Sequence, residues 1–505
     1  MSEKGYDAII IGGGLGGLTS GAKLAKEGKR VLLVEQHTKP GGCATVFQRG
    51  EYTVEVSLHK TPLPTKGDAV SEILDDLGVL EQVVFLPDSE FYRFVNARVD
   101  INIPYGLEAA SELLIGQFPA EEKGIRKVFA LFARVLAELS KLPREKWKLA
   151  LLFPLLPAIC PNLVFKERAT VGTFLDAVIR DEDLKMILLG NSVFYYHYDP
   201  YAMSLLMYAL SQGTFFKYGG SYIRGGSQQL SDYLAEKIRR HGGEVLLGHQ
   251  VTEIIVEGNR AVGVKYRKKG FSSEEINVTA ACVVANAAMP NVVSQLLPDS
   301  KGSRRLIARI NGQRLANSFT SVYVGTKRQL RGPGHSHSTV VFDPQVGSQA
   351  DVASSHQFDF TKRSFLYTDY SSVKSQLAPD GKGMGVILVN DWLAHWEDLS
   401  PSEYRARKQL VADTLVERVE RLIPGLASEI EDCEVATPKT IARYTLNPGG
   451  TPLGFANEPD QWGRHRVAQK SPVKNLYFAS AWTLPCGGFG GAMMSGYTCA
   501  EEILG

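Results

Sequence analysis

The sequence predicts an α/β fold that begins with a strand, a turn, a helix and a second strand of a parallel sheet. Residues 6–11 are a short, almost wholly apolar run, as in a parallel strand buried on both faces. A glycine cluster follows at 12–17, and apolar residues then recur at helical spacing up to Glu27. A second apolar run, 31–34, ends at Glu35. This order is typical of a dinucleotide-binding unit.

The glycine cluster has the spacing of a phosphate-binding loop. Gly12 permits the tight turn, and Gly14 lets the backbone approach a pyrophosphate. Gly17 lets the following helix pack closely on the strand. Leu15 and Gly16 open that helix, whose free N–H groups and positive dipole end attract phosphate.

Glu35 and a second glycine turn narrow the choice of dinucleotide. Glu35 ends the second strand, where a carboxylate is expected to accept hydrogen bonds from a ribose. Its charge would repel a 2′-phosphate, so FAD or NAD is favoured over NADP. Gly41, Gly42 and Cys43 follow in a turn that suits a chain wrapping the flavin side of the nucleotide. No second glycine fingerprint follows a strand, so a separate NAD(P)H domain is not expected.

With these residues the sequence resembles the flavoprotein superfamily of phytoene desaturases, carotenoid isomerases, retinol saturases and amine oxidases, which implies FAD as cofactor. The strand at 50–55 fits the next block of that family. The glycine turn at 225–227 and its helix lead to Val251, which matches the position whose backbone contacts adenine. Asn286 and Ala287 match the end of the returning strand.

A block near the C-terminus resembles the family's terminal FAD motif. Residues 475–483 form an apolar strand, with Ser480 where glycine is more usual, and a glycine turn follows. We interpret the next segment as a helix that starts near Ala492 and whose N-terminus stabilises the negative charge of reduced flavin. The candidate cofactor contacts in this block are Ala481, Gly491, Ala492 and Met493.

The resemblance implies a Rossmann-like FAD-binding domain of the glutathione reductase type, interrupted by a mixed α+β substrate domain. It assigns residues 1–70, 220–300 and 435–505 to the first domain, and 71–219 and 301–434 to the second. It implies an FAD-dependent oxidoreductase that desaturates, saturates or isomerises carbon–carbon bonds of a long apolar lipid, such as a carotenoid, retinoid or fatty acyl chain. An amine oxidase-like enzyme and a non-enzymatic lipid carrier are the alternatives.

Residues 149–165 are unusual within the expected substrate domain. The run carries no charge and contains three prolines, so it is too short and too broken for a comfortable transmembrane helix. Basic residues flank it, namely Arg144, Lys146, Lys148, Lys166 and Arg168. This pattern suits peripheral contact with one leaflet of an anionic membrane, with a buried helix pair or a dimer contact as the alternatives.

Apolar and aromatic residues elsewhere in this region have two interpretations. Phe129, Phe132, Leu136 and Leu139 recur at helical spacing and predict an amphipathic helix packed on the core. The aromatic clusters at 194–198 and 214–218 either line a tunnel for an apolar ligand or pack between domains.

His59 is the candidate catalytic residue, because it follows the strand at 54–57 and histidine can move protons near neutral pH. A histidine bonded to flavin or backbone is the alternative. Lys60 is a weaker candidate for flavin electrostatics. The basic cluster 464–466 is expected to meet a carboxylate or solvent. The residues suggest no metal site.

Composition excludes some partners and leaves others open. A net charge of +2 gives no electrostatic case for nucleic acid. The six scattered cysteines and the absence of a signal-like N-terminus predict a cytoplasmic protein with reduced thiols, associated with the cytoplasmic face of a membrane if the apolar segment makes contact. The oligomeric state does not follow from the sequence.

Overall fold

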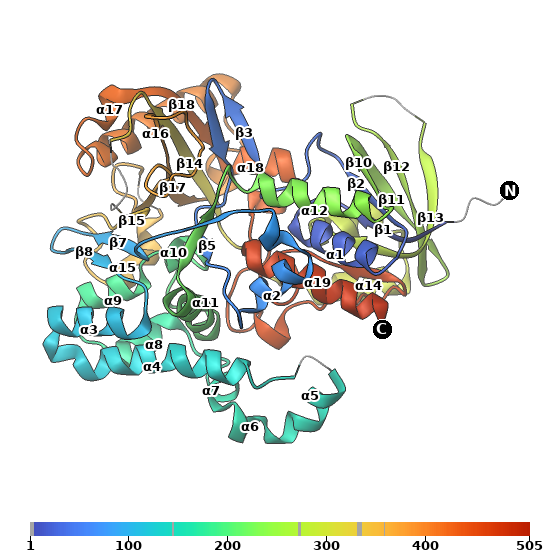
Figure 1. Cartoon of the computed structure of the whole chain (residues 1–505), viewed down its shortest axis with the longest axis horizontal. Helices are drawn as coiled ribbons and strands as arrows, with labels where there is room; N and C mark the ends of the chain where they lie inside the picture. The colour runs from blue at the N-terminus through green and yellow to red at the C-terminus, as the bar shows by residue number, and fades with distance from the viewer. Residues whose placement is uncertain (1–4, 144–145, 271–273, 331–335, 358) are drawn as a thin grey trace.

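The computed structural model describes residues 5–143, 146–270, 274–330, 336–357 and 359–505. Two large sheets lie on opposite sides of the molecule in Figure 1, and a helical layer extends below one of them. The mixture of parallel and antiparallel strands confirms the predicted α/β class.

The first sheet is parallel where the glycine loop emerges. Its parallel strands, in spatial order, are β10 (Glu244–Leu247), β2 (Val31–Glu35), β1 (Tyr6–Ile11), β13 (Ile276–Ala285) and β19 (Leu476–Phe478). Ile11 pairs with Ala285, which pairs with Phe478. The carboxyl ends of β1, β13 and β19 therefore meet at one edge. The antiparallel strands β12 (Arg260–Lys268) and β11 (His249–Glu257) extend the sheet.

Both faces of the parallel strands are covered. Ala8 and Ile10 of β1 pack on the side of α1 (Leu15–Lys26), α12 (Gln228–Arg240) and α19 (Gly488–Leu504). Ile9 and Ile11 pack on the opposite side against β11 and β12. This alternation explains why the strands are continuously apolar, as expected for a sheet without a solvent face.

The last helix begins earlier than the sequence indicated. It starts at Gly488, so the expectation of a start near Ala492 is wrong. The first turn lies directly on the preceding chain, because a Cβ on Gly491 would stand 2.3 Å from the carbonyl oxygen of Cys486. Glycine allows this close approach, and it also hid the helix from a propensity-based assignment.

The second sheet is mixed and draws on two separated stretches of chain. Its strands, in spatial order, are β18 (Ile430–Ala436), β14 (Ser318–Thr326), β17 (Gly383–Asp391), β16 (Phe365–Asp369), β15 (Ser338–Val341), β7 (Tyr92–Val95) and β8 (Asp100–Ile103). Only β15 and β7 pair in parallel. Helix α16 (Pro401–Glu420) packs on one face through residues such as Leu415.

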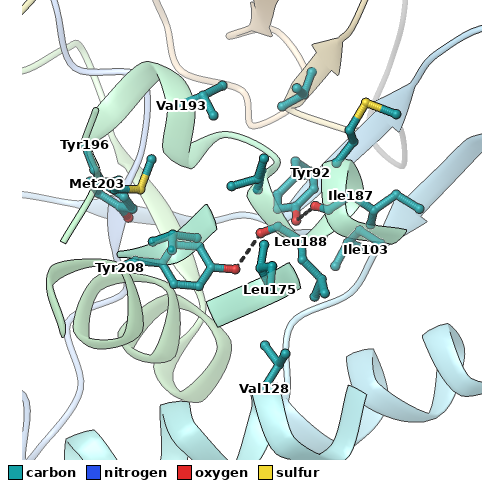
Figure 2. Packing of buried hydrophobic residues seen from close by; sticks show 14 of the residues in the cluster. Tyr92, Ile103, Val128, Leu175, Ile187, Leu188, Val193, Tyr196, Met203 and Tyr208 are labelled. Atoms are coloured by element: carbon teal, nitrogen blue, oxygen red, sulfur yellow. Dashed lines mark hydrogen bonds between the residues drawn. The ribbon is translucent and has the colours of Figure 1, made fainter. Parts of the chain in front are cut away.

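A helical layer packs against the other side of this sheet. It contains α3 (Leu107–Gln117), α4 (Glu122–Leu139), α8 (Val171–Val178), α9 (Glu182–Leu189) and α11 (Leu205–Tyr218). Figure 2 shows how two buried tyrosines are satisfied in this core. The Tyr92 hydroxyl donates to the carbonyl of Ile187, and that of Tyr208 donates to Leu188, each at 2.7 Å.

The apolar run 149–165 forms an arm that projects from this layer (Figure 1). It consists of α5 (Lys146–Leu152), a 3₁₀ turn, α6 (Leu156–Ile159) and α7 (Pro161–Phe165). Leu151 is 70% exposed and Phe165 is 74% exposed, and Phe153 and Leu155 are also exposed. The interpretation of residues 149–165 as a buried helix pair is therefore wrong, because the outer surface of the arm is exposed. Arg144 lies outside the described residues.

Candidate functional site

A large cavity joins the edge of the first sheet to the helical layer. Its volume is about 1710 Å³, whereas pockets for drug-sized ligands take roughly 300–1,000 Å³. The glycine loop and Glu35 line it, and so do Tyr195 and Phe215 from the helical layer. One continuous space can therefore hold a dinucleotide and a second ligand.

The glycine loop forms a cradle that a side chain would fill. Gly12 has a φ of +93°, which favours glycine. A Cβ on Gly16 would stand 2.1 Å from the carbonyl oxygen of Ala479, and one on Gly17 would stand 2.3 Å from that of Gly12. The first turn of α1 contains no acidic residue, so its N–H groups and positive dipole end remain suited to a pyrophosphate. These features fit the phosphates of FAD.

The second glycine turn packs on the first. The Gly41 N–H donates to the carbonyl of Gly13 at 2.6 Å, and a Cβ on Gly42 would stand 3.3 Å from the Cα of Gly14. Gly41 has a φ of +126° and Gly42 a φ of +61°. The two turns therefore form one wall of the cavity, and a side chain at Gly42 would press on the first turn.

The Glu35 carboxylate is buried at the end of β2 and held in place by the backbone. It accepts from the N–H of Gly13 at 2.6 Å and from that of His37 at 2.7 Å. A carboxylate has about four acceptor positions, so capacity remains for ribose hydroxyls. On the other side of the loop, the Asn286 amide donates to the carbonyl of Gly12 at 3.1 Å. Both residues line the cavity.

The structure brings most of the sequence-predicted cofactor contacts to this cavity. Those that line it are Gly12, Gly14, Leu15, Gly16, Glu35, Gly41, Gly42, Cys43, Val251, Asn286, Ala287, Ala481, Gly491 and Ala492. Gly17 and Met493 lie behind the wall. Gly17 packs against Gly12, and Met493 belongs to the core beneath α1 and α19.

Cys43 and Cys486 line the cavity as neutral thiols. Burial raises the pKa of Cys43 to about 11, and it raises that of Cys486 as well. A thiol of high pKa stays protonated at neutral pH, which favours a packing role over a redox role for both. All six cysteines are unpaired.

His59 faces the cavity from a buried position. Its Nδ1 lies 2.9 Å from the Tyr370 hydroxyl, and its ring stacks on Tyr195 with the ring centres 6.3 Å apart. Burial and the nearby His337 lower the pKa of His59 to about 3. The imidazole is therefore neutral at physiological pH. Tyr370 contacts Nδ1, so Nε2 is the ring nitrogen that can face a bound molecule.

Lys60, beside it, is committed to the protein. Its ammonium group is fully buried, pairs with Asp88 and donates to the backbone carbonyls of Glu90 and Phe91. Burial lowers the pKa of Lys60, which the Asp88 carboxylate opposes. This geometry therefore disfavours a direct contact of Lys60 with the flavin.

Glu55 organises the site; from the sequence it was placed in the strand that fits the next block of the family, but it was not given a role. It ends β4 (Tyr52–Glu55), the partner of β3 (Val46–Arg49), and it is fully buried. Its carboxylate accepts from the Tyr222 hydroxyl at 2.9 Å and from the N–H and hydroxyl of Ser227, both at 2.7 Å. Ser227 precedes α12, so Glu55 fastens the middle block to the N-terminal block. The available sequence signal was an acidic residue at the end of the short strand 52–55.

The part of the cavity away from the glycine loop is an apolar tunnel. One face of α11 lines it, through Met207, Leu210, Ser211, Thr214 and Tyr218, which recur at helical spacing. The C-terminal end of α4 adds Leu136 and Leu139, whereas Phe129 and Phe132 of the same helix lie in the core. The aromatic clusters divide in the same way: Tyr195 and Tyr218 line the cavity, whereas Phe216 packs in the core of the helical layer. Ser140 and Leu142, which follow α4 and precede the arm in the chain, also line the cavity, so the tunnel reaches the base of the arm.

The basic cluster 464–466 divides between surface and interior. Arg464 forms a two-fold contact with Glu167, at 2.6 and 2.7 Å. Arg466 is fully buried, and among the described residues its guanidinium donates only to backbone carbonyls and to the Asn457 side chain. The sequence could not have shown this difference between neighbours.

Comparison with known proteins agrees with this geometry. The profile of the "flavin containing amine oxidoreductase" family matches residues 15–504. Human all-trans-retinol 13,14-reductase is 27% identical over 539 residues, covering 100% of this chain and 86% of that protein. Chloroplastic prolycopene isomerase of Arabidopsis thaliana is 26% identical over 522 residues, covering 99% and 83%.

A solved structure supports the fold. Cyclohexylamine oxidase from Brevibacterium oxydans superposes with a TM-score of 0.62 at 16% identity, covering 99% of this chain and 98% of that one. The resemblance inferred from the sequence and the Rossmann-like fold are thus confirmed. The chain belongs to the flavin-containing amine oxidoreductase family, and it is an FAD-dependent oxidoreductase.

Proposed function

We propose that this enzyme acts on carbon–carbon bonds of a long apolar lipid, such as a carotenoid, a retinoid or a fatty acyl chain. The reaction is a desaturation, a saturation or an isomerisation. Bound FAD supplies the hydride acceptor or donor at its N5 atom. The residues of the chain bind and orient both molecules and exclude water. Similarity to a retinol reductase and to a prolycopene isomerase supports this substrate class.

The observation that carries the proposal is the continuity of the cavity. The space that begins at the glycine loop runs without a break into the tunnel along α11 and α4. Apolar side chains such as Leu210 and Leu136 dominate the tunnel wall. A compact cage for a small polar amine would not need this length. A chain-like apolar substrate would bury its whole length there and gain roughly 25 cal/mol per Å².

We propose that His59 is a hydrogen-bond donor to the bound ring or substrate. Its low pKa argues against a proton carrier at neutral pH. The Tyr370 hydroxyl is closer to the His59 Nδ1 (2.9 Å) than to the carbonyl of Leu58 (3.3 Å). A hydroxyl that donates to Nδ1 fixes the tautomer that carries its hydrogen on Nε2. The cofactor contacts and the two-domain division predicted from the sequence are part of the same proposal.

Anaerobic mixing of the flavoenzyme with candidate lipids tests the function. Bleaching of the flavin spectrum would indicate desaturation, and reoxidation of pre-reduced flavin would indicate saturation. A changed lipid without a net flavin change would indicate isomerisation. Leu210→Trp should block the tunnel and abolish the response, whereas Leu410→Trp, on the exposed surface of α16, should leave it intact. Rapid oxygen uptake with amines and no response to any lipid would overturn the proposal.

We further propose that the arm formed by α5 to α7 contacts one leaflet of a membrane and delivers the lipid to the tunnel. Its exposed side chains, Leu151, Phe153, Leu155 and Phe165, are apolar, and Lys166 and Arg168 follow directly. No helix among the described residues is long and apolar enough to cross a bilayer.

Sedimentation with anionic phosphatidylglycerol vesicles tests the arm. Each buried Leu or Phe contributes about 1.5–3 kcal/mol. Leu151→Ser with Phe165→Ser should therefore weaken vesicle binding at least tenfold, and Leu410→Ser should not. Unchanged sedimentation of the double variant, or loss of a dimer instead of vesicle binding, would contradict membrane contact.

A further inference from the structure

Arg466 is a fully buried cation without a carboxylate partner among the residues that the structure describes. Its Nη2 donates to the carbonyl of Ala481 at 2.7 Å and its Nε to that of Thr483 at 3.1 Å. Its Nη1 donates to the carbonyl of Phe455 at 3.1 Å and to the Asn457 Oδ1 at 3.4 Å. All four partners are neutral, so its hydrogen bonds are satisfied while its charge is not balanced.

Other buried cations in this protein are balanced. Among the described residues each forms at least one ion pair with a carboxylate: Lys60 with Asp88, Lys185 with Asp176 and Glu182, Arg363 with Asp391, and Arg418 with Asp343. Burying a charge without a counter-charge is costly, and proteins usually avoid it. Burial lowers the pKa of Arg466 to about 10, which still leaves it protonated at neutral pH. The Cys486 thiol interacts electrostatically with Arg466, but burial raises the pKa of that thiol, so it stays neutral. The positive charge therefore needs an anion that the described residues do not provide.

The position of Arg466 indicates where that anion forms. Arg466 lies behind the terminal motif: it donates to the carbonyls of Ala481 and Thr483, and the neighbouring residues Ala481, Trp482 and Leu484 line the cavity whereas Arg466 does not. Helix α19 follows these residues in the chain, and the positive dipole end at its N-terminus adds to the electric field of the Arg466 charge. Reduction of FAD adds two electrons and one proton to its ring system, so the ring acquires negative charge in this cavity.

We propose that Arg466 acts through this wall as the fixed counter-charge of the reduced, anionic FAD. The charge is placed before the reaction and needs no reorganisation when electrons arrive, which is the condition for effective electrostatic stabilisation. Arg466 is fully buried, and the low effective dielectric of a buried site keeps its field strong. The inference concerns the cofactor, so it holds whichever lipid is the substrate.

Asn457 offers a test that preserves the arginine. Asn457→Asp is nearly isosteric and supplies the missing carboxylate at the contact with Nη1. Asn457→Ala is the matched control, because it also loses the hydrogen bond from Asn457 to the carbonyl of Tyr196 but adds no charge. Both variants and the wild type are compared as FAD-loaded enzymes, with the midpoint potential measured by dithionite titration. Sulfite affinity is a second measurement, since sulfite addition also leaves negative charge on the flavin ring.

Asn457→Asp should weaken sulfite affinity at least tenfold and lower the potential by about 30 mV or more, the two-electron equivalent of that factor. Asn457→Ala should change sulfite affinity less than twofold. Arg466→Lys should retain the wild-type potential, and Arg466→Met should lower it. Equal shifts in the two Asn457 variants, or unchanged potential and sulfite affinity in FAD-loaded Asn457→Asp, would overturn the proposal.

Discussion

Replacing Glu55 with glutamine should loosen the junction between the N-terminal and middle blocks of the FAD site. The carboxylate faces only donors: the Tyr222 hydroxyl, both polar hydrogens of Ser227, and more weakly the N–H groups of Ser57 and Leu58. A glutamine has one acceptor oxygen and turns its amide donors toward those same groups. At least two buried donors then lose their partner.

Each unsatisfied buried donor costs about 1–3 kcal/mol, so Glu55→Gln should lower the free energy of unfolding by roughly 2–6 kcal/mol. Urea unfolding of the FAD-loaded enzyme measures this difference, and flavin released on gel filtration reports the local effect. Glu51→Gln, on the same hairpin, is the control. Glu51 is exposed and pairs with Lys382 at 2.7 Å, and a pair of that kind contributes about 0–1 kcal/mol. Equal stability of Glu55→Gln and Glu51→Gln would refute the role given to Glu55.

Two further predictions concern the glycine loop and His59. Gly16→Ala places a Cβ 2.1 Å from the carbonyl oxygen of Ala479, so the variant should be purified with little bound FAD. The ratio of flavin to protein absorbance measures this loss. Gly116→Ala is the control, because Gly116 has open space around it and the variant should bind FAD normally. Because the folded pKa of His59 lies near 3 and the unfolded value near 6.5, its contribution to stability is fully present above about pH 6.5 and is lost as the pH falls toward 3. The loss should reach about 2 kcal/mol at pH 5, and His59→Gln should abolish that component; an identical pH dependence of unfolding in the variant would exclude the assignment.

The nucleotide-binding edge was predictable because its chemistry is local in the chain. Strands β1 and β2, helix α1 and the glycine loop follow from apolar periodicity and glycine spacing. The start of α19 was not predictable, because glycines 490 and 491 are poor helix formers, and Gly491 is required there by close packing on Cys486.

Features that depend on distant partners could not be read from the chain. Lys60 and Arg466 are both buried cations, yet one is neutralised by Asp88 and the other only hydrogen-bonded by carbonyls. Residues 149–165 would read the same in sequence whether buried or exposed; only the fold places Leu151 and Phe165 outside. Periodicity also could not separate the core residues of α4 from those, such as Leu136, that line the tunnel.

Mass spectrometry of the lipid that copurifies with the enzyme tests the central claim most directly. Organic-solvent extracts of the wild type should contain a long apolar lipid, which differs by two hydrogens or by bond geometry after one anaerobic turnover. Extracts of Leu210→Trp should lack that lipid, and those of Leu410→Trp should contain it. A wild-type enzyme that holds FAD but neither carries nor converts any apolar lipid would contradict the account.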